Sequence, residues 1–174
     1  MSQKWNDVKS EFIEHWGNLG NAWGVNRTMA QIGALLMVSP DPLCTDQIME
    51  ELGLSRGNVH NHIKDLQSWN MIRTVKISGD RKEYFTAEKD PWKMVCLLAR
   101  EKQRREVEPT LDVLRECLRS CSDMDDREEN KREIDPFVNQ LTELEGFLEQ
   151  TSKVLGRLSK SEKSTVLKWL MKML

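Results

Sequence analysis

Residues 44–87 decide the fold, and they read CTDQIMEELGLSRGNVHNHIKDLQSWNMIRTVKISGDRKEYFTA. The pattern predicts a short helix, a turn, a second helix and then a hairpin of two strands. Gly53 marks the turn, because glycine adopts the left-handed conformation that ends a helix at little cost. Leu54 follows and is expected to fill the core between the helices. The stretch therefore predicts a helix-turn-helix with a hairpin wing.

The first helix of this stretch is expected to begin at Thr45, whose hydroxyl can cap its N-terminus. Asp46 follows in the first turn, where a negative charge interacts favourably with the helix dipole. Ile48, Met49 and Leu52 fall on one side at helical spacing. An apolar side of this kind predicts a helix that packs on a core.

The second helix has one apolar face and one open, polar face. Ser55 is a natural N-cap, and Val59, Ile63 and Leu66 share a face at helical spacing. The opposite face is rich in hydrogen-bond donors and nearly free of bulk, with Gly57, Asn61, Lys64 and Ser68 flanked by Arg56, Asn58 and His60.

This polar face suits the major groove of a DNA duplex. Asparagine can bond adenine at two points, and arginine and lysine address guanine edges. Serine and the free backbone N–H groups of a helix N-terminus hold phosphate. Gly57 would let the start of the helix lie close to the sugar-phosphate backbone. The second helix is therefore expected to read DNA.

The wing is expected to add positive charge. Residues 72–77 and 82–87 are β-rich runs joined by Ser78-Gly79-Asp80-Arg81, an ordinary hairpin connection. Cations exceed acids between residues 55 and 82 although the chain has a formal net charge of −2, and such a local excess indicates a nucleic-acid surface. The candidate DNA-contacting residues are Thr45, Ser55, Arg56, Gly57, Asn58, His60, Asn61, Lys64, Lys76, Arg81 and Lys82.

The remaining composition indicates a protein of the cytoplasm. A chain of 174 residues is long enough for one sizeable core and an extension. The start is polar and charged, and the longest uncharged run, between Arg27 and Asp41, is too short to span a bilayer. We therefore expect no signal peptide and no membrane partner. Free thiols are expected at Cys44, Cys96, Cys117 and Cys121.

Two helices are expected before the helix-turn-helix. One spans residues 3–20, and the other spans residues 27–38 and stops before a proline-rich turn at residues 39–42. These helices and the wing predict a DNA-binding domain at residues 1–89, followed by a helical dimerisation region at residues 90–174. The apolar side of the first helix is formed by Trp5, Val8, Phe12, Trp16 and Leu19.

The region after Asp90-Pro91 is expected to be wholly helical, with two apolar seams at heptad spacing. Pro109 should kink or restart the first of these helices. A charged connection at residues 122–133 separates the seams, and a last short helix is expected from about Ser161. The first seam is Val107, Leu111, Leu114, Leu118 and Cys121, and the second is Ile134, Phe137, Leu141, Leu144, Leu148, Thr151, Leu155 and Leu158.

Two apolar seams are hard to bury within one small subunit. A homodimer would bury them, and its two-fold symmetry would suit a palindromic operator in which each half-site takes one reading helix. An antiparallel hairpin within one chain could bury part of both seams instead. The overall expectation is a mainly α protein with a small β-hairpin, in which a winged helix-turn-helix domain carries long C-terminal dimerisation helices.

Four motifs in order resemble those of the GbsR-like subgroup of the MarR winged-helix regulators, over roughly residues 12–120. They are Ser39-Pro40-x-Pro42-Leu43, Leu54-Ser55-Arg56-Gly57-Asn58-Val59, Gly79-Asp80-Arg81-Lys82 and Asp90-Pro91-Trp92. The resemblance implies a dimeric transcriptional regulator whose DNA-reading helix includes Ser55, Arg56, Gly57, Asn58, His60 and Asn61, with Arg81 in the wing. The subgroup commonly has Ser where this chain has His60, which leaves the base preference there open. The section after about residue 122 matches no motif of the subgroup.

The same resemblance raises the question of an effector, because some subgroup members look like sensors of choline-type compounds. Aromatic cages hold such quaternary ammonium groups by cation–π attraction. The chain has six tryptophans, and we hypothesise that Trp16, Trp23 and Trp92 approach one another. Aromatic residues at helical spacing also occur as ordinary core residues.

The sequence indicates a binding protein rather than an enzyme. His60 and His62 are two residues apart on a helix and point in different directions, so they make a poor metal pair. No glycine-rich phosphate loop follows a strand, and no catalytic residue, metal site or cofactor is expected. We therefore expect a sequence-specific transcriptional regulator, acting as a repressor. The alternative is a winged-helix protein-interaction module that does not bind DNA, and salt dependence would separate the two.

Overall fold

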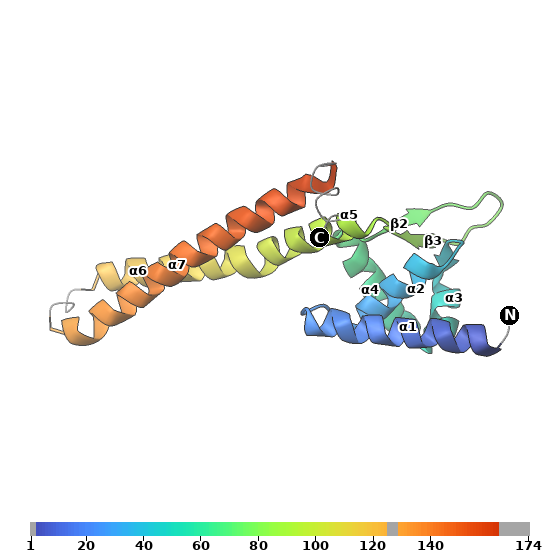
Figure 1. Ribbon diagram of the computed structural model, residues 1–174, viewed down its shortest axis with the longest axis horizontal. Helices are drawn as coiled ribbons and strands as arrows, with labels where there is room; N and C mark the ends of the chain where they lie inside the picture. The colour runs from blue at the N-terminus through green and yellow to red at the C-terminus, as the bar shows by residue number, and fades with distance from the viewer. Residues whose placement is uncertain (1–2, 125–128, 164–174) are drawn as a thin grey trace, which may run out of the picture. The chain divides into compact units, whose positions relative to one another are not determined.

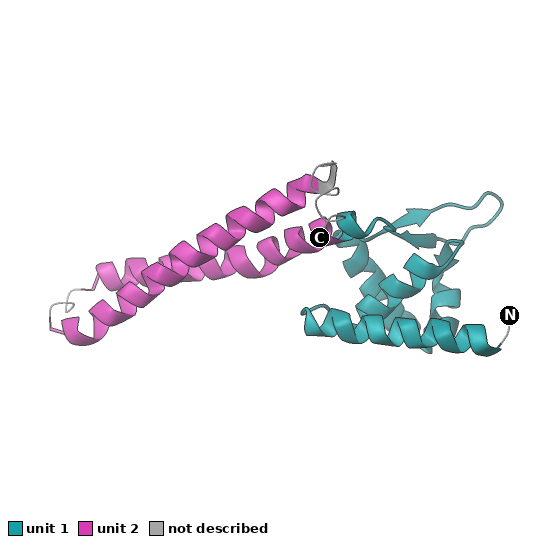
Figure 2. Ribbon diagram, in the orientation of Figure 1, with its two compact units in different colours: residues 1–94 teal, residues 95–174 magenta. Residues whose placement is uncertain are grey.

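The computed structural model describes residues 3–124 and 129–163 of the chain. The chain forms two compact units, residues 1–94 and residues 95–174 (Figure 2). The first unit ends at residue 94 rather than at the expected residue 89, because a helix that begins at Pro91 runs through both units. Each unit has its own architecture.

The first unit is a winged helix-turn-helix domain with an additional N-terminal helix (Figure 1). The helices follow the order that the sequence predicts, and three short strands accompany them. The elements are α1 (Gln3–Ala22), α2 (Arg27–Val38), β1 (Leu43–Cys44), α3 (Thr45–Leu52), α4 (Arg56–Ser68), β2 (Ile72–Val75), β3 (Tyr84–Ala87) and the start of α5 (Pro91–Lys102).

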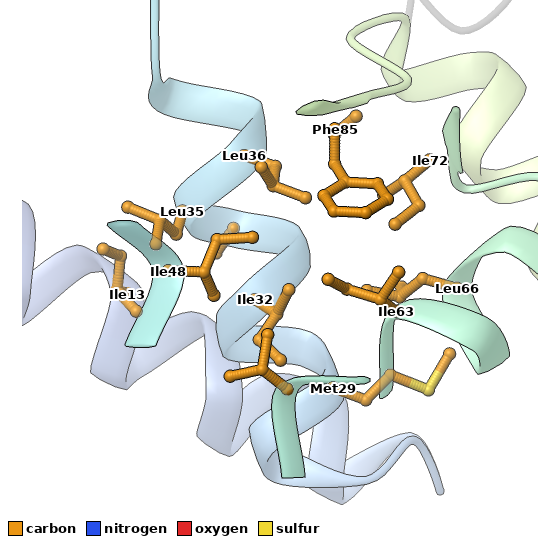
Figure 3. Close-up of a cluster of buried hydrophobic side chains, with 13 residues drawn as sticks. Ile13, Met29, Ile32, Leu35, Leu36, Ile48, Ile63, Leu66, Ile72 and Phe85 are labelled. Atoms are coloured by element: carbon orange, nitrogen blue, oxygen red, sulfur yellow. The ribbon is translucent and has the colours of Figure 1, made fainter. Parts of the chain in front are cut away.

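Helix α2 lies at the centre of this unit. Asn26 caps it, because its Oδ1 accepts a hydrogen bond from the backbone N–H of Met29 at 3.1 Å. Side chains of α2 meet those of α1, α3, α4 and the sheet in one core (Figure 3). The buried core residues are Ile13, Met29, Ile32, Ala34, Leu35, Leu36, Ile48, Val59, Ile63, Leu66, Ile72, Phe85 and Ala87.

The wing contains three strands rather than the expected two. The antiparallel sheet has the order β1-β3-β2, and Phe85 of β3 pairs with Leu43 on one side and with Thr74 on the other. Strand β1 has two residues, which is too short for a detectable alternating pattern. The paired part of the hairpin is also shorter than the predicted runs, because β2 ends at Val75 and β3 begins at Tyr84.

Helix α1 packs on α2 through small residues. A Cβ atom added to Gly20 would lie 2.5 Å from the Cβ of Ala30, and one added to Gly17 would lie 2.6 Å from the Cγ of Gln31. Both distances are shorter than van der Waals contact, so only glycine permits this approach of the two helices. Ile13 is the large apolar residue that α1 buries in the core.

The apolar side of α1 predicted from the sequence is therefore only partly buried. Phe12 and Trp16 pack against the edge of the core. Trp5 is 52% exposed, and Val8 and Leu19 are also exposed. The helical period was predicted correctly, but the side that faces α2 is the glycine side. Trp5, Val8 and Leu19 form an apolar stripe on the surface.

The second unit is built from long helices. It contains most of α5, a π-helical segment (Gln103–Val107), α6 (Glu108–Ser122), α7 (Lys131–Ser159) and a 3-10 turn (Lys160–Lys163). Pro109 lies in the first turn of α6, directly after the π-helical segment. A proline cannot donate the backbone hydrogen bond of a regular helix, so the change of helical period at this point agrees with the predicted restart. The last helix predicted from about Ser161 falls mostly on residues 164–174, outside the described residues.

Helices α6 and α7 pack against each other as an antiparallel hairpin (Figure 1). Arg115 bridges them, donating from Nε to Glu145 Oε1 at 2.9 Å and from Nη2 to Glu149 Oε1 at 2.7 Å. This is the intramolecular arrangement that the sequence left as an alternative. The hairpin buries Leu111 and Cys121. It leaves Val113, Phe137, Leu144, Phe147 and Val154 exposed, with Phe147 at 65% and Val154 at 62%.

The π-helical segment is anchored by polar contacts. Gln103 Nε2 donates to Ser152 Oγ of α7 at 3.0 Å, and the Gln103 side chain lies against Gly156. Glu101 is buried, and its Oε2 accepts from Arg104 Nη2 at 2.6 Å and from Arg105 Nε at 2.9 Å. These hydrogen bonds give the buried carboxylate of Glu101 charged partners one turn away along the chain. Within the ranges that the structure describes, no helix is long and apolar enough to cross a bilayer.

Candidate nucleic-acid interface

The turn between α3 and α4 has the geometry that the sequence predicts. Gly53 ends α3 in the left-handed conformation, with φ of 63°. Ser55 caps α4, because its Oγ accepts from the backbone N–H of Asn58 at 3.4 Å. Val59 and Ile63 point into the core, which fixes the rotation of α4 about its axis. The opposite face of α4 therefore lies at the surface.

The predicted role of Thr45 as a helix cap is wrong by one residue. Helix α3 begins at Thr45, and Cys44 occupies the cap position. The backbone N–H of Cys44 donates to Gln47 Oε1 at 2.9 Å, which is the reciprocal bond of a capping box. Thr45 is half-buried in the first turn of α3, close in sequence to the candidate interface, and it does not cap the helix.

The exposed face of α4 holds the predicted reading residues. Arg56, His60, Asn61 and Lys64 are exposed, and Asn58 is half-buried. Gly57 is exposed, and a Cβ atom added there would have nothing within 4 Å. The start of α4 therefore has free space in front of it.

The wing loop, residues 76–83, is organised by Asp80. Its Oδ1 accepts from the backbone N–H of Lys82 at 2.9 Å, and its Oδ2 accepts from the Tyr84 hydroxyl at 2.7 Å. The Lys82 N–H and the Tyr84 hydroxyl lower the pKa of Asp80, and the carboxylate in turn raises the pKa of Tyr84. Gly79 takes a positive φ of 87° beside them. The loop is thus held by its own residues.

The wing presents Lys76, Arg81 and Lys82 at the surface. Lys76 was predicted in the strand, but β2 ends at Val75 and Lys76 belongs to the loop. Within the described part of the chain, no ion pair involves Lys64, Lys76 or Arg81. These three cations are available to an anionic partner.

Asp46 is a residue of this surface whose role the sequence did not predict. Arg56 Nη2 donates to its Oδ1, and Lys82 Nζ donates to its Oδ2 at 3.1 Å. The two cations hold the pKa of Asp46 below its usual value, with Lys82 the larger cause, and Asp46 raises the pKa of Lys82. The sequence shows only a favourable acid in a first helical turn. Its contact with a residue 36 positions away depends on the fold.

The three tryptophans of the hypothesised cage come from α1, from the residue directly after it and from the start of α5. Trp16 packs on Phe12, with ring centroids 5.6 Å apart, and Trp23 is 56% exposed after α1. Trp92 lies at the start of α5, where its backbone N–H donates to Asp90 Oδ1 at 2.9 Å. Figure 1 shows α1 along one edge of the unit and the start of α5 at the other.

The described residues form neither a metal site nor a disulfide. No group of three or more His, Cys, Asp or Glu side chains there could hold a metal ion. The cysteines are free thiols, with Cys117 half-buried and Cys44, Cys96 and Cys121 buried. His60 is exposed, whereas His62 is half-buried with its Nδ1 3.7 Å from Asp65 Oδ2.

The fold and this surface define a winged helix-turn-helix domain, and comparison with known proteins agrees. Residues 29–74, from α2 to β2, match the model of a family described as bacterial regulatory protein, arsR family. Over 94 residues the chain is 28% identical to the HTH-type transcriptional repressor GbsR of Bacillus subtilis (strain 168). That match covers 54% of this chain and 52% of the relative, so the chain spans about half the length of that protein.

The fold likeness extends beyond the winged domain. A crystal structure of a transcriptional regulator is similar, with a TM-score of 0.57 and 21% sequence identity. The similarity covers 88% of this chain and 99% of that one, so both units of this chain contribute to it. At this level of identity the likeness concerns the fold alone. The expected fold class, a winged helix-turn-helix domain followed by long C-terminal helices, is confirmed.

Proposed function

We propose that the protein is a sequence-specific DNA-binding transcriptional regulator that acts as a repressor. The observation that carries this proposal is the combination of the open, polar face of α4 with unpaired cations on α4 and the wing. The match to the arsR family model and the relative described as a repressor support it. We further propose membership of the GbsR-like subgroup of the MarR regulators, a cytoplasmic location and no catalytic role.

In the proposed complex, α4 enters the major groove of the duplex. Its N-terminus, opened by Gly57 and capped by Ser55, lies toward the sugar-phosphate backbone, where helix N–H groups bind anions. Asn61 contacts base edges, and Lys64 contacts a base edge or a phosphate. Lys76 and Arg81 of the wing bind neighbouring phosphates, which position the protein without selecting a sequence.

We propose that the protein acts as a homodimer on a palindromic operator. A single chain leaves Phe137, Leu144, Phe147 and Val154 exposed on α7, although these residues lie on or beside the predicted seam. Isolated apolar residues are common on protein surfaces, but a row of them along one helix is typical of an interface. The second copy would cover this row, and repression would follow from occupation of a promoter.

The quaternary-ammonium effector stays a prediction. Such a site would draw on Trp16, Trp23 and Trp92, of which Trp23 is exposed and Trp16 packs on Phe12. Titration with choline or glycine betaine while Trp fluorescence is followed tests it directly. An unchanged fluorescence spectrum at millimolar ligand would rule out a quaternary-ammonium effector.

Selection of bound duplexes from a random pool tests the proposed function. A DNA-binding regulator enriches a common, two-fold symmetric sequence, whereas a protein-interaction module enriches none. Arg81→Ala should weaken binding to the enriched duplex and to a scrambled duplex alike, because its partner is phosphate. Unchanged affinity of Arg81→Ala at moderate salt would show that the wing does not contact DNA.

A further inference from the structure

Two cations of the proposed DNA-binding surface are held by a single carboxylate. Arg56 is the first residue of α4, and Lys82 is in the wing loop. Arg56 Nη2 donates to Asp46 Oδ1 and Lys82 Nζ to Asp46 Oδ2, the latter at 3.1 Å. All three side chains are about half exposed or more, so a duplex can reach them. The carboxylate therefore lies on the surface that DNA would cover.

Asp46 links α3 to the start of α4 and to the wing loop. It lies in the first turn of α3, which the core fixes through Ile48. The wing loop is tied separately by Asp80, which accepts from the backbone N–H of Lys82 at 2.9 Å. Lys82 is thus held at its backbone by Asp80 and at its ammonium group by Asp46. These bonds connect the start of α4 with the wing loop.

The effect of such a bridge on folding is small, because water screens ion pairs between exposed groups. Its effect on DNA binding would act through the two cations that it holds. Protein cations that neutralise phosphates release counterions from the duplex, and this release supplies the sequence-independent part of the affinity. Arg56 and Lys82 contribute fully only when they leave Asp46. Lys64, Lys76 and Arg81 have no such competitor among the described residues.

We propose that Asp46 is a positioning residue of the DNA-binding surface, holding Arg56 and Lys82 at a fixed separation and withholding both from non-specific phosphate contacts. The inference rests on the proposed function and deepens it. A duplex whose backbone matches the held separation binds without rearrangement of the two cations. Any other duplex must compete with the carboxylate for them. Asp46 therefore increases discrimination between the operator and other DNA.

Asp46→Asn tests this proposal, because it keeps the size of the side chain and removes its charge. We expect the affinity for a scrambled duplex to rise by about two- to fivefold, as one partner of an exposed pair is lost. The dependence of log K on log salt should steepen by about 0.9 for each cation released, and so by up to about 1.8. The affinity for the selected duplex should rise less or fall, so the ratio of the two affinities should decrease.

Two further variants separate positioning from general charge. Glu50→Gln removes a carboxylate from the same helix, one turn away, that has no ion pair in the described part of the chain. It should change the salt dependence less than Asp46→Asn does. Asp46→Glu keeps the charge and should restore most of the discrimination. Fluorescence anisotropy with both duplexes over a range of salt, and thermal unfolding of each variant, are the measurements.

Each possible outcome either supports or overturns the proposed role of Asp46. A steeper salt dependence and a lower affinity ratio in Asp46→Asn alone, at an unchanged unfolding temperature, support the proposal. Equal behaviour of Asp46→Asn and Glu50→Gln overturns it, as does a parallel loss of affinity for both duplexes with a lower unfolding temperature. In those cases wild-type protein still binds its selected duplex, and the proposed function stands. Failure of the wild-type protein to select any duplex would reject the function and this inference together.

Discussion

Asn61 lies on the exposed face of α4, in its second turn, where a side-chain amide can bond adenine at two points. We predict that Asn61→Ala weakens binding to the selected duplex by about 1–3 kcal/mol, the usual discrimination of one such contact. Binding to a scrambled duplex should stay unchanged, because the asparagine carries no charge. Anisotropy titrations with the two duplexes measure both affinities.

Lys64→Ala is the matched control on the same face of α4. It removes a positive charge and should weaken binding to both duplexes, with a less steep salt dependence. Equal losses for both duplexes in Asn61→Ala would show that Asn61 contacts no base. In that case the reading residues would lie elsewhere on α4.

Tyr84 is the single tyrosine of the chain and reports on the wing loop. Its hydroxyl donates to Asp80 Oδ2 at 2.7 Å, and ionisation would break this bond and place a phenolate beside a carboxylate. The pKa of Tyr84 is therefore raised. We predict that Asp80→Asn lowers the pKa of Tyr84, measured by absorbance near 295 nm as pH rises. An unchanged titration midpoint would show that the wing bond is absent in solution.

Residue roles that depend on close neighbours in the sequence could be predicted, and roles that depend on the fold could not. Gly53 and Ser55 were predicted correctly, because a left-handed stop and a serine cap depend only on neighbours within a few positions. Thr45 was assigned one position too far along as a cap, because Gln47 bonds the backbone of Cys44 instead. Asp46 could not be recognised, since both its partners reach it through the fold.

The two glycines around the helix turn allow a test at the scale of the element. Gly53 has a φ of 63° and open space around it, so an added methyl group meets only backbone strain. We predict that Gly53→Ala destabilises the first unit by about 1–2 kcal/mol, the usual cost of the left-handed conformation. Urea unfolding followed by circular dichroism measures the change.

Gly57→Ala is the companion variant, because Gly57 also has nothing within 4 Å but lies within α4. Its stability should match or slightly exceed that of the wild type, since alanine favours a helix. Its affinity for DNA should nevertheless fall, as the methyl group occupies the space in front of the helix start. Wild-type DNA affinity in Gly57→Ala would mean that the backbone of the duplex does not approach this residue.

The helices were predicted better than their packing or the strands. Apolar periodicity placed α1, α2 and α4 correctly, because it depends on single elements. It could not show which side of α1 meets α2, since glycine contacts with Ala30 decide that and glycine carries no hydropathy signal. Strand β1 was missed because two residues show no alternation, and it is recognised only by pairing with β3.

At the scale of the whole molecule, the proposed dimer depends on the exposed row of α7. We predict that Phe147→Asp shifts the protein from dimer to monomer in sedimentation equilibrium, because it places a charge where the second copy would cover an apolar ring. Loss of the dimer should also weaken binding to a two-fold symmetric duplex far more than binding to one half-site.

Asn139→Asp is the control, because it adds the same charge at an exposed position of α7 outside this apolar row. It should leave the dimer intact. A Phe147→Asp protein that remains dimeric would place the interface elsewhere, for example on the apolar stripe of α1.

Division into a winged domain and a helical region could be predicted, since composition and period change near Asp90-Pro91. The sequence could not predict how much of the two seams the intramolecular hairpin buries and how much remains for a second copy to cover. Both solutions satisfy the same heptad spacing, and only the three-dimensional contacts of α6 with α7 show how much one chain buries by itself.

The glycine contact between α1 and α2 has a consequence for local unfolding. Helix α1 buries only Ile13 among its large apolar side chains, packs Phe12 and Trp16 against the edge of the core, and turns Trp5 and Val8 to the surface, so it has fewer buried apolar side chains than α2. Regions with few buried apolar contacts open at lower free energy than the core around them. The amide hydrogens of α1 in an isolated chain therefore exchange with solvent sooner than those of α2, whose side chains form the centre of the domain.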